Sequence, residues 1–201
     1  QTTNNSTRAS VQSRLCDLIV PFHVLYYYLV CFMERRIERE KKIFLENPSI
    51  QPDMEGSHYI LERQLKPEAR KDIIKKLKEI GVKPTSMIDI SDGLASETLH
   101  LCTESNVGCL LYEKKIPIDD TAIQRAKEFN LNPTVCALNG GEDYELLFTI
   151  DISDHDKIKK LARDITVIGH ITEKSEGTNL VLKGTEMLTP ITAQGWNHLS
   201  K

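Results

Sequence analysis

The chain has 201 residues, 26 Lys and Arg against 29 Asp and Glu, a formal net charge of −3 and five cysteines. This length allows one full domain plus an appendage, and the charge balance gives no basic patch for nucleic acid, so we expect no nucleic-acid partner. The cysteines are widely spaced and form no C-x-x-C pair, which indicates neither a zinc site nor a secreted disulfide framework, so we expect reduced thiols in a cytoplasmic protein.

The first 33 residues differ in composition from the rest of the chain. A polar leader is followed by an almost wholly apolar run from Leu18 to Met33. This run is shorter than the ~20 residues that a membrane-spanning helix needs, and Pro21 and His23 lie inside it. A membrane segment is the alternative, but we expect residues 1–33 to be a non-native or disordered leader that belongs to neither an anchor nor the native core.

Residues 34–56 connect this leader to the main domain. Glu34 to Leu45 is a charged stretch in which Glu38 and Lys42 stand four residues apart, as on one face of a helix. Two prolines and a glycine follow between Asn47 and Ser57, and this pattern is typical of a linker. We therefore place the start of the main domain at residue 57 and its end at residue 201.

Hydrophobic periodicity predicts the secondary structure of this domain. Helices are predicted over residues 67–80, 93–104, 120–129 and 155–163, and strands over 86–90, 108–112, 144–150, 166–172 and 179–182. The helices and strands do not follow a strict β-α-β alternation. We therefore predict the α+β class, with a mixed β-sheet covered by helices.

The first candidate site is the segment from Met87 to Leu94. Its strand pattern places Asp89 and Ser91 on one face, and Asp92 comes at the turn into the next helix. Carboxylate and hydroxyl oxygens are ligands that suit Mg²⁺, which leaves its other positions to water and substrate phosphate. The alternative is that Ser91 or Asp92 only caps the helix.

The second candidate site begins at Asn139. Gly140 and Gly141 allow a positive φ and a close approach to a ligand, and Glu142 follows at once before an apolar strand. A surface turn with solvated carboxylates is the alternative. Trp196 is the only tryptophan and could cap the core, or hold a flat cationic ring. The sequence has no P-loop, dinucleotide, zincin or hydrolase motif, so phosphoryl chemistry would depend on acidic residues and metal ions.

Three motifs together resemble the C-terminal half of thiamine-monophosphate kinase. They are the segments Met87 to Leu94, Gly140 to Thr149 and Gly195 to His198. The resemblance covers about residues 37–201 and keeps the order and spacing of the motifs. It implies that residues 34–56 are the exit helix of the family's N-terminal domain, which is missing here, and the linker that follows it. It implies a fold like that of the C-terminal domain of aminoimidazole ribonucleotide synthetase, a member of the same superfamily.

The resemblance implies ATP-dependent phosphorylation of thiamine monophosphate to thiamine diphosphate, with Mg²⁺ as cofactor and ATP as co-substrate. By motif position Asp89 and Asp92 would bind metal, Ser91 would contact ATP, and Glu142 and Trp196 would hold the substrate. No residue is assigned as a covalent or acid–base catalyst, because phosphoryl transfer depends mainly on positioning and charge neutralisation. The full-length parent is expected to form a homodimer.

The resemblance also implies that a part of the enzyme is missing. The N-terminal domain of the family carries most of the ATP site and most metal-binding aspartates, and nothing in residues 1–33 is similar to it. We therefore expect a C-terminal fragment that is inactive alone. The alternatives are a non-catalytic module that binds thiamine phosphates and another ATP-dependent member of the superfamily.

Overall fold

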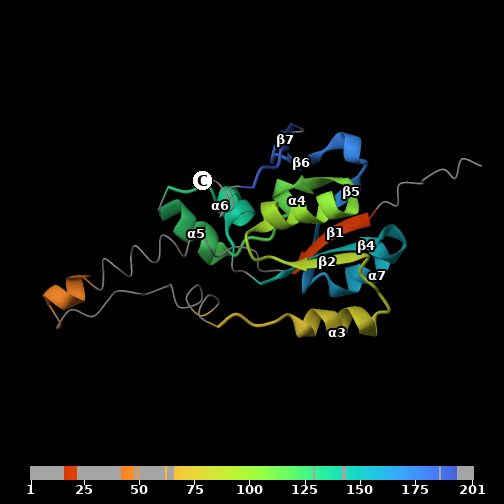
Figure 1. The fold of residues 1–201 in the computed structure, drawn as a ribbon. Coiled ribbons are helices and arrows are strands. Elements are labelled where there is room, and N and C mark those ends of the chain that lie inside the picture. The colour runs from red at the N-terminus through yellow and green to blue at the C-terminus, as the bar shows by residue number, and fades with distance from the viewer. Residues whose placement is uncertain are drawn as a thin grey trace, which may run out of the picture.

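The computed structural model describes residues 16–21, 42–47, 49, 62, 66–128, 130–141, 144–185 and 187–193. Within these ranges one seven-stranded sheet has the order β2-β4-β1-β5-β3-β6-β7 (Figure 1). The strands are β1 (Cys16–Pro21), β2 (Ser86–Asp89), β3 (Gly108–Tyr112), β4 (Leu146–Asp151), β5 (Ile165–Thr172), β6 (Thr178–Val181) and β7 (Leu188–Pro190). The pairing of β3 with β6 is parallel and the other pairings are antiparallel, which confirms the predicted mixed sheet.

The α-helices that cover the sheet are α3 (Lys71–Glu79), α4 (Leu94–Ser105), α5 (Asp120–Glu128), α6 (Pro133–Asn139) and α7 (His155–Ile158). The predicted helices and strands of residues 67–182 are confirmed, with shifts at their ends. The helix predicted over residues 155–163 is α7 followed by a 3₁₀ turn over Lys159–Leu161, as tighter turns are common at helix ends. The sequence reasoning missed α6, β7 and β1.

Helices cover both faces of the sheet. One core cluster joins α4, α5 and α6 to the sheet, and a second joins α3 and α7 to the opposite face (Figure 1). Consecutive residues of a strand point to opposite faces of the sheet, and in β4 Leu147 belongs to the first cluster and Phe148 to the second. Such a sheet is buried on both faces and gives apolar runs rather than polar alternation in its central strands.

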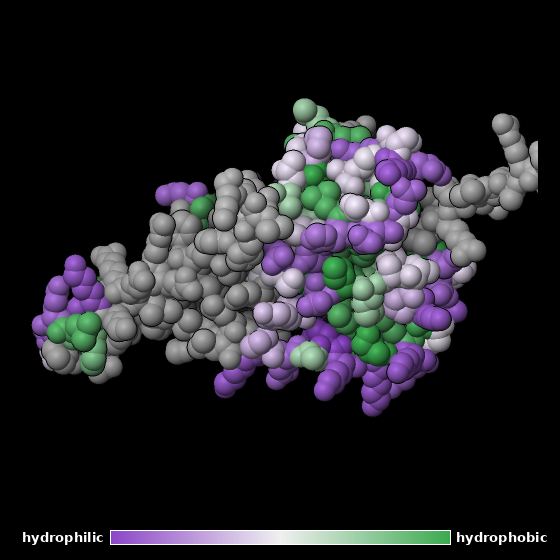
Figure 2. Space-filling view, in the orientation of Figure 1, coloured by the Kyte–Doolittle hydropathy of each residue, from purple (hydrophilic) through white to green (hydrophobic). Residues whose placement is uncertain are grey.

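Helix α3 illustrates how the covering helices are built. Ile73 and Leu77, four residues apart, are its buried side chains. The other positions are mostly charged, and Figure 2 shows them as a hydrophilic fringe along the outer edge of the molecule where Figure 1 places α3. The helix therefore contributes a narrow apolar stripe to the core and a solvated face.

Strand β1 corrects the expectation for residues 1–33. Cys16–Pro21 lies between β4 and β5 and pairs antiparallel with both. Leu18 is 1% exposed and Ile19 0%, and they pack into opposite core clusters. The His155 side chain makes a hydrogen bond to the Asp17 carboxylate of the same strand. These six residues thus form an inner strand of the sheet and are not a disordered leader. The expectation failed because periodicity cannot identify a short apolar strand that is buried on both faces.

The remaining boundaries of the domain division stay predictions. Residues 42–46 are helical, within the charged stretch for which a helix was expected, and the rest of 34–56 lies almost entirely outside the described residues. Residues 22–33 of the apolar run also lie outside them. Among the residues that the structure describes, no helix is long and apolar enough to cross a membrane. Cys102, Cys109 and Cys136 are buried free thiols.

Candidate functional site

The loop between β2 and α4 carries three of the predicted site residues. Strand β2 ends at Asp89, and Ile90 anchors the chain in the core at 0% exposure. The exposed Asp92 and the half-buried Ser91 follow before α4 begins at Leu94. Asp89 is also exposed, so both carboxylates are accessible from solvent at one end of the strand.

A buried glutamate that the sequence reasoning missed organises this loop. Glu97, in the first turn of α4, is 2% exposed. Its Oε1 accepts hydrogen bonds from the Ser91 N–H at 3.0 Å, the Ser91 hydroxyl at 2.9 Å and the Asp92 N–H at 2.8 Å. Its Oε2 is buried and accepts no hydrogen bond from any described residue. The carboxylate therefore fixes the two residues for which metal and ATP contacts are predicted.

The capping alternative for Ser91 and Asp92 does not fit this geometry. The residue at the cap of α4 is Gly93, and no side chain makes a cap hydrogen bond there. Gly93 has a φ of 117°, which side-chain-bearing residues rarely adopt, so a glycine is required at this point. The Ser91 hydroxyl donates to Glu97 instead of capping the helix.

The two predicted motifs lie directly against each other. A Cβ on Gly141 would be 2.2 Å from the Ser91 carbonyl oxygen, and a Cβ on Gly93 would be 2.9 Å from the Leu138 carbonyl oxygen. Gly140 has a φ of −78°, and Gly141 is not among the residues with positive φ. The glycines were expected to serve positive φ or ligand approach, but Gly141 is required because two backbones meet there.

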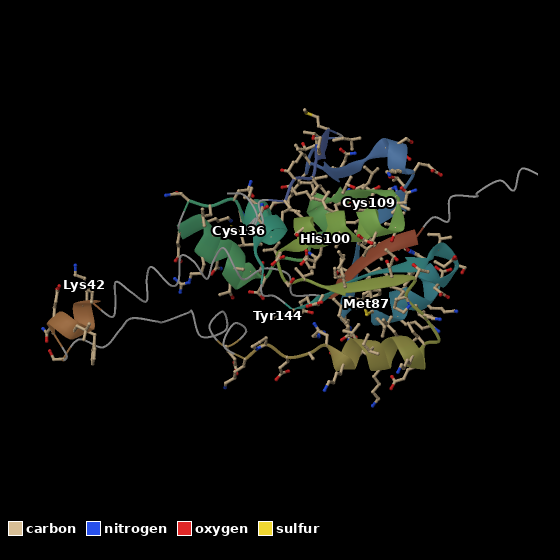
Figure 3. All side chains as sticks on the ribbon, in the orientation of Figure 1. Lys42, Met87, His100, Cys109, Cys136 and Tyr144 are labelled. Carbon is tan, nitrogen blue, oxygen red and sulfur yellow. The ribbon has the colours of Figure 1, made fainter. Side chains whose placement is uncertain are left out.

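The start of β4 extends the same contact. The Ile90 N–H donates to the Glu145 carbonyl at 2.8 Å, and the Tyr144 N–H donates to the Ile90 carbonyl at 3.0 Å. Tyr144, labelled in Figure 3, has a φ of 52° and is 40% exposed. A left-handed conformation is uncommon for a bulky residue and is found most often where surrounding structure imposes it, including at functional sites.

A buried ion pair lies directly before β4, next to the loop between β2 and α4. Arg70 donates to Glu145, whose side chain is 0% exposed, over 2.5 Å, and makes two 3.0 Å bonds to Asp72. Burial alone would lower the pKa of Arg70, but its bonds and charge interactions with Asp72 and Glu145 raise the pKa. The hydrogen bond from Arg70 lowers the pKa of Asp72. This guanidinium is therefore engaged by two carboxylates.

The acidic loop fits part of a Mg²⁺ site. Asp89 and Asp92 offer accessible hard oxygens, and no ion pair of the described residues involves either of them. Mg²⁺ can be held by one or two carboxylates plus water and phosphate. The described residues contain no group of three or more potential metal ligands. Glu142 and Trp196, predicted to hold the substrate, lie outside the described residues.

A separate surface hollow of about 480 Å³ lies elsewhere on the sheet. It is formed by β3, the 3₁₀ turn that follows β3, β6 and the turn after β6, and its lining residues include no carboxylate. The hollow therefore shares no residue with the loop that follows β2. Its lining consists of Tyr112, Lys114, Val181, Leu182, Gly184 and Thr185.

Comparison with known proteins identifies relatives of this chain. No protein-family model matches it. A thiamine-monophosphate kinase of Pyrococcus abyssi is 35% identical over 126 residues, which cover 61% of this chain and 37% of that protein. A thiamine-monophosphate kinase of Buchnera aphidicola is 34% identical over 164 residues, 79% of this chain and 46% of that protein.

A solved structure shows the same relationship. The structure described as AaThiL complexed with AMPPCP and TMP is 26% identical with a TM-score of 0.66, covering 91% of this chain and 51% of that one. The chain thus spans about half the length of its relatives or less. The motifs that carried the resemblance and the matches to these proteins agree, and the chain belongs to the thiamine-monophosphate kinase family.

Proposed function

We propose that this chain is the C-terminal, substrate-side half of a thiamine-monophosphate kinase. The parent protein would transfer the γ-phosphoryl group of ATP to thiamine monophosphate and release thiamine diphosphate and ADP. The observation that supports the proposal is the contact between the Asp89–Gly93 loop and Gly141, because it brings two of the three sequence motifs side by side. A solved relative complexed with AMPPCP and TMP supports both substrate classes.

The chain's own residues would act by positioning. Asp89 and Asp92 would hold Mg²⁺, and Ser91 would contact ATP. The bound ion would neutralise phosphate charge, which is the main requirement of phosphoryl transfer. The buried ion pair between Arg70 and Glu145 and the bonds to Glu97 would keep this acidic loop in place without taking part in the chemistry.

The substrate would bind beside this loop. Glu142 and Trp196 are proposed to hold the thiamine moiety, with the Trp196 indole facing the cationic thiazolium ring. An aromatic face attracts such a cation by about 0.5–2 kcal/mol, depending on how far the site excludes water. Gly141 lies against Ser91, so Glu142 is next in sequence to a residue that contacts the proposed ATP loop.

The activity requires a partner domain in this proposal. The chain would be inactive alone, because the N-terminal domain of the family supplies most of the ATP site, and the complete parent would be a homodimer in the cytoplasm. The test is a kinase assay on this chain, alone and mixed with a separately produced N-terminal half of a relative. We expect thiamine diphosphate only in the mixture, and its absence under conditions where the intact relative is active would contradict the proposal.

Binding and product measurements distinguish the kinase proposal from two other functions. A non-catalytic module would bind thiamine monophosphate in a calorimetric titration without forming product in the mixture. Another ATP-dependent member of the superfamily would hydrolyse ATP, or transfer its phosphoryl group to a different acceptor, at a rate that does not change when thiamine monophosphate is added. The kinase proposal predicts that ATP with Mg²⁺ and thiamine monophosphate each bind the mixture, and that both are consumed.

A further inference from the structure

We propose that Glu97 is the positioning residue that sets the conformation and the hydrogen-bonding polarity of the Ser91–Asp92 loop. This inference rests on the proposed function for its catalytic consequence, but the structural part stands on contacts within the chain. Glu97 lies in α4 and is 2% exposed, so it reaches the loop from inside the protein and not from the solvent side.

Three donors converge on one carboxylate oxygen. The Ser91 N–H, the Ser91 hydroxyl and the Asp92 N–H all donate to Glu97 Oε1 at 2.8–3.0 Å. Hydrogen bonds to a charged acceptor are roughly twice as strong as neutral ones. Two successive backbone groups held by one side chain leave the loop little freedom, although it belongs to neither the strand nor the helix.

The contact also decides what Ser91 can offer a ligand. A serine hydroxyl has one proton to donate and two lone pairs to accept with. Its proton is directed to Glu97, so the oxygen faces any ligand as an acceptor. Ser91 would therefore meet a donor such as a metal-bound water or a ribose hydroxyl, and not an unprotonated phosphate oxygen, which can only accept.

The surroundings make Glu97 the controlling group. The other side of the loop is fixed by backbone contact, because Gly141 lies against the Ser91 carbonyl and leaves no room for a side chain. The buried Glu97 Oε2 has no hydrogen-bond partner among the described residues, so the hydrogen bonds that the structure describes for this carboxylate all come from the loop. Burying a carboxylate is costly unless hydrogen bonds replace those lost from water, and for Glu97 the three bonds from the loop do so.

The structural test is amide hydrogen exchange of Ser91 and Asp92 in the full chain. Glu97→Ala removes the acceptor, and we expect exchange of both amides to accelerate at least about tenfold. Glu97→Gln keeps one acceptor oxygen without the charge and is expected to lie between wild type and Glu97→Ala. The matched control is Glu104→Gln on the exposed part of the same helix, which should change neither amide. Unchanged protection in folded Glu97→Ala and Glu97→Gln would overturn the inference.

The catalytic test uses the mixture of this chain with the N-terminal half. We expect Glu97→Gln to raise the KM for ATP and the Mg²⁺ concentration at half-maximal rate by about tenfold, while the KM for thiamine monophosphate stays unchanged, because a tenfold change corresponds to one weakened charge-assisted bond. Partial rescue at high Mg²⁺ would support a positioning role. Loss of kcat alone, as from a smaller folded fraction, would overturn it.

The two tests also separate this inference from the proposed function. If the wild-type mixture forms no thiamine diphosphate, the proposed function fails, while faster exchange of Ser91 and Asp92 in the Glu97 variants still supports their control by Glu97. If the mixture is active and Glu97→Gln matches wild type in both KM values, Mg²⁺ dependence and exchange, the proposed function stands and this inference fails.

Discussion

Replacing Ile19 tests whether β1 is native core. Ile19 is 0% exposed in a strand paired on both sides, and it packs into the cluster that contains Phe148, Ile73 and Leu77. Truncating a buried isoleucine to alanine costs about 2–5 kcal/mol, depending on how far the cavity collapses. Because a central strand between two covering helices can relax little, we expect Ile19→Ala to lose about 4–5 kcal/mol of unfolding free energy, in the upper part of this range.

The assay is urea denaturation followed by circular dichroism, with a check that the slope stays constant. Ile152→Ala is the control, because Ile152 directly follows β4 and is 47% exposed, and it should cost less than about 1 kcal/mol. Ile19→Val, with an expected cost of about 0.5–1.5 kcal/mol, provides the measurement if Ile19→Ala does not fold. Equal losses for Ile19→Ala and Ile152→Ala, or no loss for Ile19→Val, would show that β1 does not contribute to the core.

Three further predictions concern the support of the site. Arg70→Met leaves the buried Glu145 without its 2.5 Å cation contact and should cost about 3–5 kcal/mol in urea denaturation; a loss no larger than that of Ile152→Ala would contradict the buried pair. Gly141→Ala would place a Cβ 2.2 Å from the Ser91 oxygen and should cost about 1–3 kcal/mol, and unchanged stability together with unchanged Ser91 exchange would refute the contact. Asp72, with its pKa lowered by Arg70, stabilises the fold above the unfolded carboxyl pKa of about 4, and this contribution is lost as the pH falls through the folded value. Because the Asp72 side chain is 50% exposed, Asp72→Asn should cost under about 1 kcal/mol at pH 7, and the gap from wild type should close below about pH 4 in acid-denaturation curves rather than widen.

Local patterns carried much of the fold prediction. Helix α4 and strand β3 have clear periodicity or a short apolar run with turn residues at each end, and both appear close to the predicted bounds. Helix α6 was missed because it is only Pro133–Asn139, although Asn132 as a cap followed by proline is a recognisable start signal. The three exposed residues of β7 offer no such pattern.

Strand β1 could not be assigned from its own residues. Its partners β4 and β5 come more than 120 residues later, and its residues from Leu18 onward form the start of the apolar run that ends at Met33. The composition of residues 1–33 therefore indicates a single leader segment and does not reveal a strand within it. Only the pairing with distant strands identifies Cys16–Pro21 as a strand.

The candidate site residues could be selected from the sequence, but the contacts that hold their loop could not. Asp89, Ser91 and Asp92 could be selected because their side chains have suitable chemistry. Glu97 looked like an ordinary helix residue, since burial depends on contacts that the sequence does not display. The steric need for Gly141 likewise depends on how close the Ser91 backbone lies.

The most direct test of the account is the rate of thiamine diphosphate formation by the mixture of this chain with the N-terminal half, with and without Asp89→Asn. The account predicts ATP- and Mg²⁺-dependent product with the wild-type chain and a fall of orders of magnitude with Asp89→Asn. The exposed Asp156→Asn serves as the control and should keep the wild-type rate. Near-normal product formation by Asp89→Asn would contradict the claim that the loop after β2 carries the phosphoryl-transfer site.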